Sequence, residues 1–160
     1  FVYRRPPPGN ARWQLAGSKP CRGTKIVACI KALPEAGGRF AAGEQLASPD
    51  PSSGRRDCVN IYDIEGGVDR PPVVTFWEHE ELVTCLSNCP GSVADGPGLV
   101  ASGSKDKTVR LYDVRSGQAA GMVASAATSG PGLGHANMIT CLDFLRGPGG
   151  GRLLSAGMEP

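Results

Sequence analysis

The sequence has no long apolar run, although 40% of its 160 residues are hydrophobic. No stretch approaches the roughly 18 consecutive apolar residues that a membrane-spanning helix needs, so we expect no contact with a membrane. The opening residues, FVYRRPPPGNARW, also lack the apolar core of a secretory signal peptide. They lack an initiator methionine as well, and we therefore expect that Phe1 is not the natural N-terminus.

Neither sign of charge is in large excess. The formal net charge is +2, whereas a surface that binds nucleic acid normally needs a concentrated basic face. We therefore expect no direct binding of nucleic acid, and an indirect contact only if the chain is part of a ribonucleoprotein complex.

A second pair of metal-ligating residues is also missing. Cys85 and Cys89 lie close together near His79, but a structural zinc site needs four ligands in paired spacings. Four cysteines lie inside apolar or alternating runs: Cys29, Cys58, Cys85 and Cys141. A reduced cysteine in such a run behaves as a small buried hydrophobe. We expect intracellular packing thiols, with no metal and no cofactor.

What the sequence does contain is a repeat. VTCLS at Val83–Ser87 matches ITCLD at Ile139–Asp143 after a shift of 56 residues, and the same shift backwards reaches Cys29 within KIVACIKAL. CVNIYDIEGG at Cys58–Gly67 matches TVRLYDVRSG at Thr108–Gly117 at a separation of 50 residues. Insertions are tolerated in loops and not in packed strands, so repeats with matching cores can differ in length. A recurring unit of this size predicts a repeat architecture.

Each unit has the pattern of β-strands, and no helical period of useful length is present. Apolar residues alternate, and Gly- and Pro-rich turns separate the runs. In the central unit we expect strands at Leu82–Ser87, Leu99–Ser104, Thr108–Asp113 and Gln118–Ser125. Before it we expect Ile26–Leu33, Arg39–Gln45, Cys58–Asp63 and Val73–Trp77, and after it Met138–Phe144 and Arg152–Ala156. Residues 1–23 are then the end of a preceding unit or a linker, and the units are 24–78, 79–134 and 135–160.

The segment LVASGSKDKTVRLYDVRSG at Leu99–Gly117, with His79 before it and Gly134–His135 after it, resembles the WD-repeat (transducin beta-like) family. The resemblance implies an all-β fold of β-propeller blades with four antiparallel strands each. In these terms 24–78 is a degenerate blade, 79–134 a well-formed blade and 135–160 the truncated first half of a further one. Because a propeller closes with roughly four to eight blades, we expect an incomplete propeller fragment with open, sticky sheet edges.

The resemblance also implies a hydrogen-bonded set of four side chains in the central unit: His79, Ser102, Asp106 and Tyr112. The family usually has tryptophan at the last position. A buried carboxylate that accepts from an imidazole and from backbone N–H groups fixes its turn, whereas an unpaired one is costly. The next unit matches at His135 and Ser155, with Glu159 at the aspartate position. Unit 24–78 lacks the histidine and has the insertion Ala47–Asp57 in place of the short turn, so we expect it to rely on packing.

A serine, a histidine and an aspartate could also form a catalytic triad. The sequence context of a nucleophile elbow is absent, and the repeat supplies a structural role for all three residues, so we predict no enzymatic activity. The predicted loops carry charged residues that are candidates for binding partners: Glu80, Glu81, Lys105, Lys107, Arg55 and Arg56.

The function implied by the resemblance is a non-catalytic scaffold, cytoplasmic or nuclear, that binds other proteins in a complex through its loop faces. Two more specific alternatives stay open. A weaker resemblance to transducin-beta-like proteins of the small-subunit processome implies a nucleolar role in pre-rRNA processing. A substrate receptor for ubiquitin ligation would use basic residues on one face to read a phosphorylated peptide.

Overall fold

The computed structural model describes residues 2–4, 14–17, 23–33, 38–65, 70–89, 98–124, 134–147 and 150–158. All the regular secondary structure in these ranges is β-strand. The strands form two four-stranded sheets and two hairpins, and every pairing is antiparallel between strands that follow one another in the chain. Each sheet is therefore a meander, which short turns can connect.

Sheet 1 contains β3 (Thr24–Leu33), β4 (Arg39–Leu46), β5 (Asp57–Asp63) and β6 (Val74–Phe76). Sheet 2 contains β7 (Val83–Asn88), β8 (Leu99–Ser104), β9 (Val109–Asp113) and β10 (Gln118–Ala124). Sheet 3 is the hairpin of β11 (Ile139–Gly147) and β12 (Gly150–Gly157). The N-terminal hairpin pairs β1 (Val2–Arg4) with β2 (Gln14–Gly17). The expected strands are all present, and their ends lie within three residues of the predicted positions.

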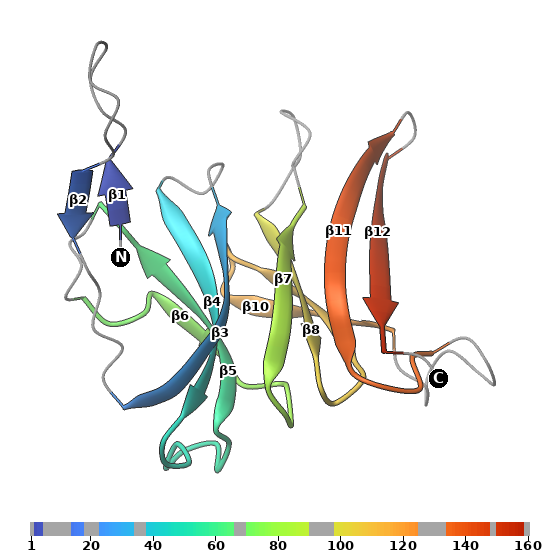
Figure 1. The fold of residues 1–160 in the computed structure, drawn as a ribbon, viewed down its shortest axis with the longest axis horizontal. Coiled ribbons are helices and arrows are strands. Elements are labelled where there is room, and N and C mark those ends of the chain that lie inside the picture. The colour runs from blue at the N-terminus through green and yellow to red at the C-terminus, as the bar shows by residue number, and fades with distance from the viewer. Residues whose placement is uncertain are drawn as a thin grey trace.

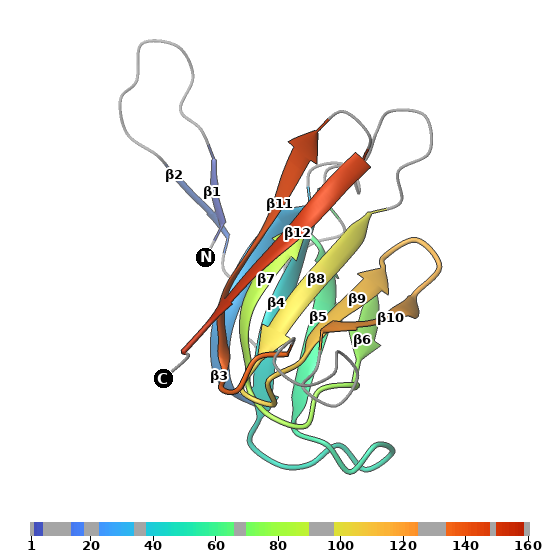
Figure 2. The same ribbon diagram turned by 90° about the vertical axis from the view of Figure 1, so that its right-hand side faces the viewer.

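The first strands of the three sheets are neighbours in space although they belong to different sheets. β7 contacts β3 on one side and β11 on the other. Figure 1 shows the sheets side by side, with the N-terminal hairpin beyond sheet 1 and sheet 3 at the opposite end. In Figure 2, sheet 3 lies in front of sheet 2, and sheet 2 lies in front of sheet 1. The protein is thus a row of similar sheets stacked face to face.

The same irregularity marks the first strand of each sheet. The register shifts between Val27 and Cys29, between Val83 and Cys85, and between Ile139 and Cys141. In each case the cysteine then pairs with a small residue of the second strand: Gly43, Gly103 or Ala156. A bulge adds one residue and bends its strand, so three bulges at one repeat position give the three strands the same local shape.

Two glycines allow neighbouring sheets to approach closely. A Cβ atom on Gly43 would lie 2.8 Å from Cγ1 of Val83, and one on Gly103 would lie 2.5 Å from Cγ2 of Ile139. Real Cβ atoms do not approach other atoms so closely, so a β-branched side chain of the next sheet occupies the space above each glycine. We call each of these glycine positions a notch.

The core lies between the sheets. One buried cluster joins sheet 1 to sheet 2 and includes Ile61, Phe76, Val83, Val100 and Tyr112. A second cluster joins sheet 2 to sheet 3 and contains Ala101, Val109, Ile139 and Leu142. Because each sheet buries its apolar side chains against its neighbours, stability comes mainly from these sheet-to-sheet contacts.

The cysteines are less buried than the sequence predicts. All five that the structure describes are free thiols, but only Cys58 is buried, Cys29 and Cys85 are half-buried, and Cys141 is exposed. The expectation is wrong for Cys141 because, in the part of the chain that the structure describes, nothing packs on the outer face of sheet 3. Burial raises the pKa of Cys29 and of Cys58 to about 12, so neither is a reactive thiolate.

Candidate functional site

His79 lies in the connection between sheets 1 and 2 and joins the turns of sheet 2 at one end. Its Nδ1 atom lies 2.7 Å from Oδ2 of Asp106, and its Nε2 atom lies 2.6 Å from Oγ of Ser102. A carboxylate only accepts hydrogen bonds, so Nδ1 carries the proton that is donated to Asp106. The histidine is 1% exposed, so it is an enclosed link between β8 and the β8–β9 turn.

Asp106 ties the β8–β9 turn to the connection before β7. Besides His79, its carboxylate accepts hydrogen bonds from the backbone N–H of Glu80 at 3.0 Å and from the backbone N–H of Thr108 at 2.9 Å. Burial alone would raise the pKa of Asp106, but the hydrogen bond and charge of His79, with the bonds from Thr108 and Glu80, lower it well below its usual range. The carboxylate is therefore ionised, and it joins the β8–β9 turn to the connection before β7.

Lys107 completes this turn with φ of 68°. Few non-glycine residues adopt this left-handed conformation. Its backbone N–H donates to the carbonyl oxygen of Ser104 at 3.2 Å, and the N–H of Lys105 donates to the carbonyl oxygen of Leu82 at 3.0 Å. The side chains of Lys105 and Lys107 are exposed, so the anchored turn presents both lysines to solvent.

Tyr112 lies in the buried cluster between sheets 1 and 2, next to Ser102. Its hydroxyl lies 3.3 Å from Oγ of Ser102, and its ring stacks on Phe76 of sheet 1 with centroids 4.4 Å apart. Burial raises the pKa of Tyr112 far above its usual range, although the Ser102 hydrogen bond opposes this. A tyrosine can therefore extend the chain of hydrogen bonds from His79 while packing against the neighbouring sheet.

The order Asp106–His79–Ser102 is the order of hydrogen bonds in a catalytic triad. Catalysis needs a hydroxyl that a substrate can reach, whereas Ser102 is 0% exposed. The Ser102 hydroxyl also faces Tyr112, which is fully buried as well. This closed arrangement supports a structural role for the three side chains.

Sheet 3 repeats only part of this arrangement. Nε2 of His135 lies 2.8 Å from Oγ of Ser155, as His79 does from Ser102. Ser155 is exposed, because sheet 3 has two strands in the described part of the chain. Glu159, predicted at the aspartate position, lies outside the described residues.

Sheet 1 has a different polar network, which the sequence did not predict. Glu44 is buried, with Oε1 accepting from the hydroxyl of Tyr62 at 2.8 Å and Oε2 accepting from Oγ1 of Thr24 at 2.8 Å. The amide Nδ2 of Asn60 lies 3.3 Å from the Tyr62 hydroxyl, and its Oδ1 accepts from Thr75 at 2.7 Å. Sheet 1 packs as expected, with Ile61 and Phe76 in the buried cluster, and the network adds hydrogen bonds to this packing. The Glu44 carboxylate of β4 joins β3 and β5, and Asn60 continues the network to β6.

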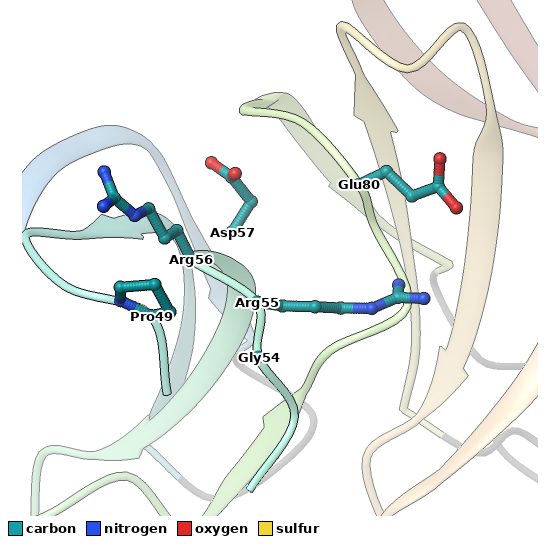
Figure 3. Close-up of a pocket in the computed structure, with 6 residues that line it drawn as sticks. All are labelled: Pro49, Gly54, Arg55, Arg56, Asp57 and Glu80. Carbon is teal, nitrogen blue, oxygen red and sulfur yellow. The ribbon is translucent and has the colours of Figure 1, made fainter. Parts of the chain in front are cut away.

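The six charged residues predicted to bind partners lie at the same end of the sheets. Glu80, Glu81, Lys105, Lys107 and Arg56 are exposed, whereas Arg55 is half-buried. Glu80 and Arg56 line one open hollow together with Pro49, Gly54, Arg55 and Asp57 (Figure 3). The hollow lies between the β4–β5 insertion and the connection to β7, so residues from both sheets form it.

Arg55 holds the two walls of this hollow together. Its Nη1 atom donates to the carbonyl oxygens of Trp77 and Glu78, both at 2.7 Å, and lies 3.4 Å from that of His79. Figure 3 shows its side chain directed towards this connection, away from Arg56. Arg55 therefore positions the segment that carries His79, while Arg56 is directed elsewhere.

Asp57 and Glu80 contribute carboxylates to the hollow, Asp57 beside Arg56 and Glu80 from the connection before β7 (Figure 3). Asp57 is buried, and its Oδ1 atom accepts a hydrogen bond from Nε2 of Gln45 at 3.0 Å. Burial raises the pKa of Asp57, with opposing effects from Gln45 and His79. Together with the exposed guanidinium of Arg56, these carboxylates offer both signs of charge within one hollow.

The described residues contain neither a cluster of metal-ligating side chains nor a membrane-spanning helix. Among the residues that the structure describes, no group of three or more histidine, cysteine, aspartate or glutamate side chains is placed to hold a metal ion. None of the described segments forms a helix long and apolar enough to cross a membrane.

The fold is all-β, and its antiparallel four-stranded sheets are of the kind that form WD-repeat propeller blades. Residues 70–113, which run from the end of sheet 1 to the end of β9, match the family described as WD domain, G-beta repeat. The Nuclear distribution protein PAC1 of Komagataella phaffii is 31% identical over 88 residues, which are 55% of this chain and 15% of that protein. The similar segment is thus a small part of the relative. Neither comparison supports the predicted resemblance to processome proteins.

Proposed function

We propose that this chain is a non-catalytic interaction module, in which successive blades at 24–78, 79–134 and 135–160 hold a set of charged loops that bind other proteins. The observation that carries the proposal is the buried link from His79 to Ser102 and Asp106, because it fixes three segments at the end where the charged side chains are exposed. Loops that a rigid framework positions are common binding sites.

The charge pattern supports a protein partner. The exposed residues at this end carry both signs: Lys105, Lys107 and Arg56 are basic, and Glu80 and Glu81 are acidic. Charges of both signs on a binding surface affect which partner is chosen and how fast it is encountered more than they affect the affinity. The match to the WD-repeat family, whose members generally act as interaction scaffolds, supports the same proposal.

The test compares partners recovered by the native protein with those recovered by loop variants. Affinity purification from the source cells, with quantitative mass spectrometry, should recover a defined set of proteins with the native sequence. The paired variants Glu80→Lys/Glu81→Lys and Lys105→Glu/Lys107→Glu should lose members of that set, whereas Met122→Asp on the exposed face of β10 should keep them. Recovery of the same proteins by all four forms would contradict binding through this end.

The identity of the recovered proteins decides between the specific roles. A cullin-type scaffold would indicate a substrate receptor, and pre-ribosomal particles would indicate the processome. Substrate turnover by the purified protein, lost in Ser102→Ala, would overturn the non-catalytic assignment.

A further inference from the structure

The hollow of Figure 3 contains a buried carboxylate that has a partner on one oxygen only. Asp57 lines the hollow and is 6% exposed. Its Oδ1 atom accepts from Gln45, whereas no hydrogen bond or ion pair from the described residues reaches Oδ2. Arg56 lies beside Asp57 but forms no ion pair with it. Buried carboxylates are normally paired with a charge or hydrogen-bonded, so Oδ2 is an acceptor that remains to be used.

The charge of Asp57 does not help the protein to fold. Burial raises the pKa of Asp57, and the hydrogen bond from Gln45 and the charges of His79 and Arg56 oppose this only in part. A raised pKa means that the folded state disfavours the ionised form, so at neutral pH the charge lowers the free energy of unfolding. The opposite holds for Asp106, whose partners lower its pKa. A charge that is kept at a cost to stability is typical of a binding site.

The hollow is large enough to admit a side chain. Its volume is about 340 Å³, whereas one water molecule takes up roughly 30 Å³ of the liquid. The β4–β5 insertion contributes Pro49 and Gly54 to the lining, and the connection before β7 contributes Glu80. A side chain with an aliphatic stem can therefore lie against the proline ring while its polar end reaches a carboxylate.

Hydrogen bonds fix both walls of the hollow. The N–H of Leu46 donates to the carbonyl oxygen of Arg56 at 2.7 Å, and the N–H of Asp50 donates to that of Arg55 at 2.8 Å. The insertion is thus closed across its width, and the Arg55 side chain ties it to the connection before β7. Because the site is pre-organised, little ordering of the protein is needed when a ligand binds.

We infer that the hollow binds a lysine side chain of a partner protein, with the ammonium group on Oδ2 of Asp57 and the aliphatic stem against Pro49. Glu80 supplies a second negative charge to the lining. Lysine fits better than arginine because Gln45 already occupies Oδ1, whereas a guanidinium fork binds best to both oxygens of a carboxylate. The inference rests on the proposed function, since it names the chemistry of the partner at one part of the charged end.

The lysine side chain alone is the first probe. Nα-acetyl-lysine N-methylamide, titrated into the isotope-labelled protein, should shift the amide NMR signals of Gly54 and Asp57 until the shifts saturate. The Nε-acetylated form of the probe lacks the positive charge and should cause no such shift, and the lysine probe should cause none in Asp57→Asn. Equal shifts with both probes, or no saturable shift with the lysine probe, would overturn the inference.

The stability of Asp57→Asn distinguishes a binding role from a structural one. Asparagine has nearly the same shape, and its Oδ1 atom can still accept from Gln45. The free energy of unfolding at neutral pH, measured with urea, should equal or exceed that of the native protein, because a buried charge is removed. A clearly less stable variant would show that Asp57 serves the fold, which would overturn the inference.

Recovery of partners by affinity purification completes the test. Asp57→Asn should lose at least one protein that the native chain recovers, whereas Asp63→Asn, at the other end of β5, should keep it. Arg56→Gln should recover more of it, because the positive charge of Arg56 acts on Asp57 and opposes a second cation there. Loss in Arg56→Gln with retention in Asp57→Asn would indicate an acidic ligand and overturn the inference.

This inference and the proposed function can fail separately. If Asp57→Asn keeps every partner while Glu80→Lys/Glu81→Lys loses some, the lysine site is wrong and binding through the charged end stands. If none of the variants at this end loses a partner, both are wrong.

Discussion

At the scale of single residues, the carboxylate of Asp106 depends on several hydrogen bonds to stay ionised in the folded protein. It accepts hydrogen bonds from His79, Glu80 and Thr108, and these bonds favour its ionised form. Removing one partner of such a buried, charged hydrogen bond costs about 1 to 3 kcal/mol. The integrity of the turn therefore depends on the charge of this one side chain.

We predict that Asp106→Asn lowers the free energy of unfolding near neutral pH and that the deficit shrinks in acid. The pKa of Asp106 is lowered in the folded protein, so its stabilisation is full above the unfolded pKa of about 3.9 and is lost as the pH falls towards the folded value. Urea unfolding between neutral pH and pH values below about 4 measures this. Glu81→Gln, at an exposed acid, should show no comparable dependence.

Gly103 gives a second prediction at this scale. A Cβ atom there would lie 2.5 Å from Ile139 and 2.8 Å from Sγ of Cys85, and overpacking of this kind costs about 1 to 3 kcal/mol. Gly103→Ala should therefore lower the melting temperature. Gly151→Ala is the matched control, because its nearest neighbours are 3.8 Å away. Equal stability of the two variants would contradict the close approach of sheet 3 at Gly103.

The sequence predicts the structural roles of some buried polar residues and not of others. The WD-repeat resemblance implied the set of His79, Ser102 and Asp106, and the structure brings these three side chains within hydrogen-bonding distance. Glu44 has no motif around it. It is paired with Cys58 in the register of β4 against β5, and its role depends on a long-reaching contact from there to the hydroxyl of Tyr62.

At the scale of elements, the β4–β5 insertion helps to position the connection that carries His79, which its amino-acid composition does not predict. The sequence from Ala47 to Asp57 is rich in proline, serine and arginine, which is typical of a solvated loop. The structure shows Arg55 of this loop binding carbonyl oxygens of the connection that carries His79. Sequence patterns identify strands and turns, but they do not show which loop a long side chain will reach across to.

We predict that Arg55→Ala loosens the connection at 77–81. Without the guanidinium, the carbonyl groups of Trp77 and Glu78 lose their partner, and the amides of this segment should exchange faster with deuterium. Arg56→Ala is a close control, since Arg56 is the adjacent residue and points away from the connection (Figure 3). Similar exchange at 77–81 in the two variants would contradict the proposed positioning role of Arg55.

At the scale of the whole molecule, stability depends on contacts between the sheets. The strands of each sheet could be predicted because local alternation determines them. The exposure of Cys141 could not, because it depends on what packs on sheet 3 and not on the apolar run in which the cysteine lies. Repeat proteins of this kind bury each unit against its neighbours, so a residue at one repeat position can be buried in one unit and open in another.

Phe76 tests this coupling between sheets. It belongs to sheet 1, is 3% exposed and stacks on Tyr112 of sheet 2. Phe76→Ala should cost about 3 to 5 kcal/mol, as other large truncations in cores do, and should destabilise both sheets together. Deuterium exchange should therefore increase in β9 as well as in β5. Faster exchange confined to sheet 1 would show that the sheets are independent.

The central claim is that His79 is locked onto the hairpin turn of sheet 2 through Asp106. Nitrogen-15 NMR of the imidazole rings tests it directly, because the chain has only two histidines and His135→Gln assigns the signals. We predict that His79 carries its proton on Nδ1 and that this proton exchanges slowly with water, and that Asp106→Asn abolishes both properties. A His79 protonated only on Nε2, or one whose Nδ1 proton exchanges rapidly, would contradict the account.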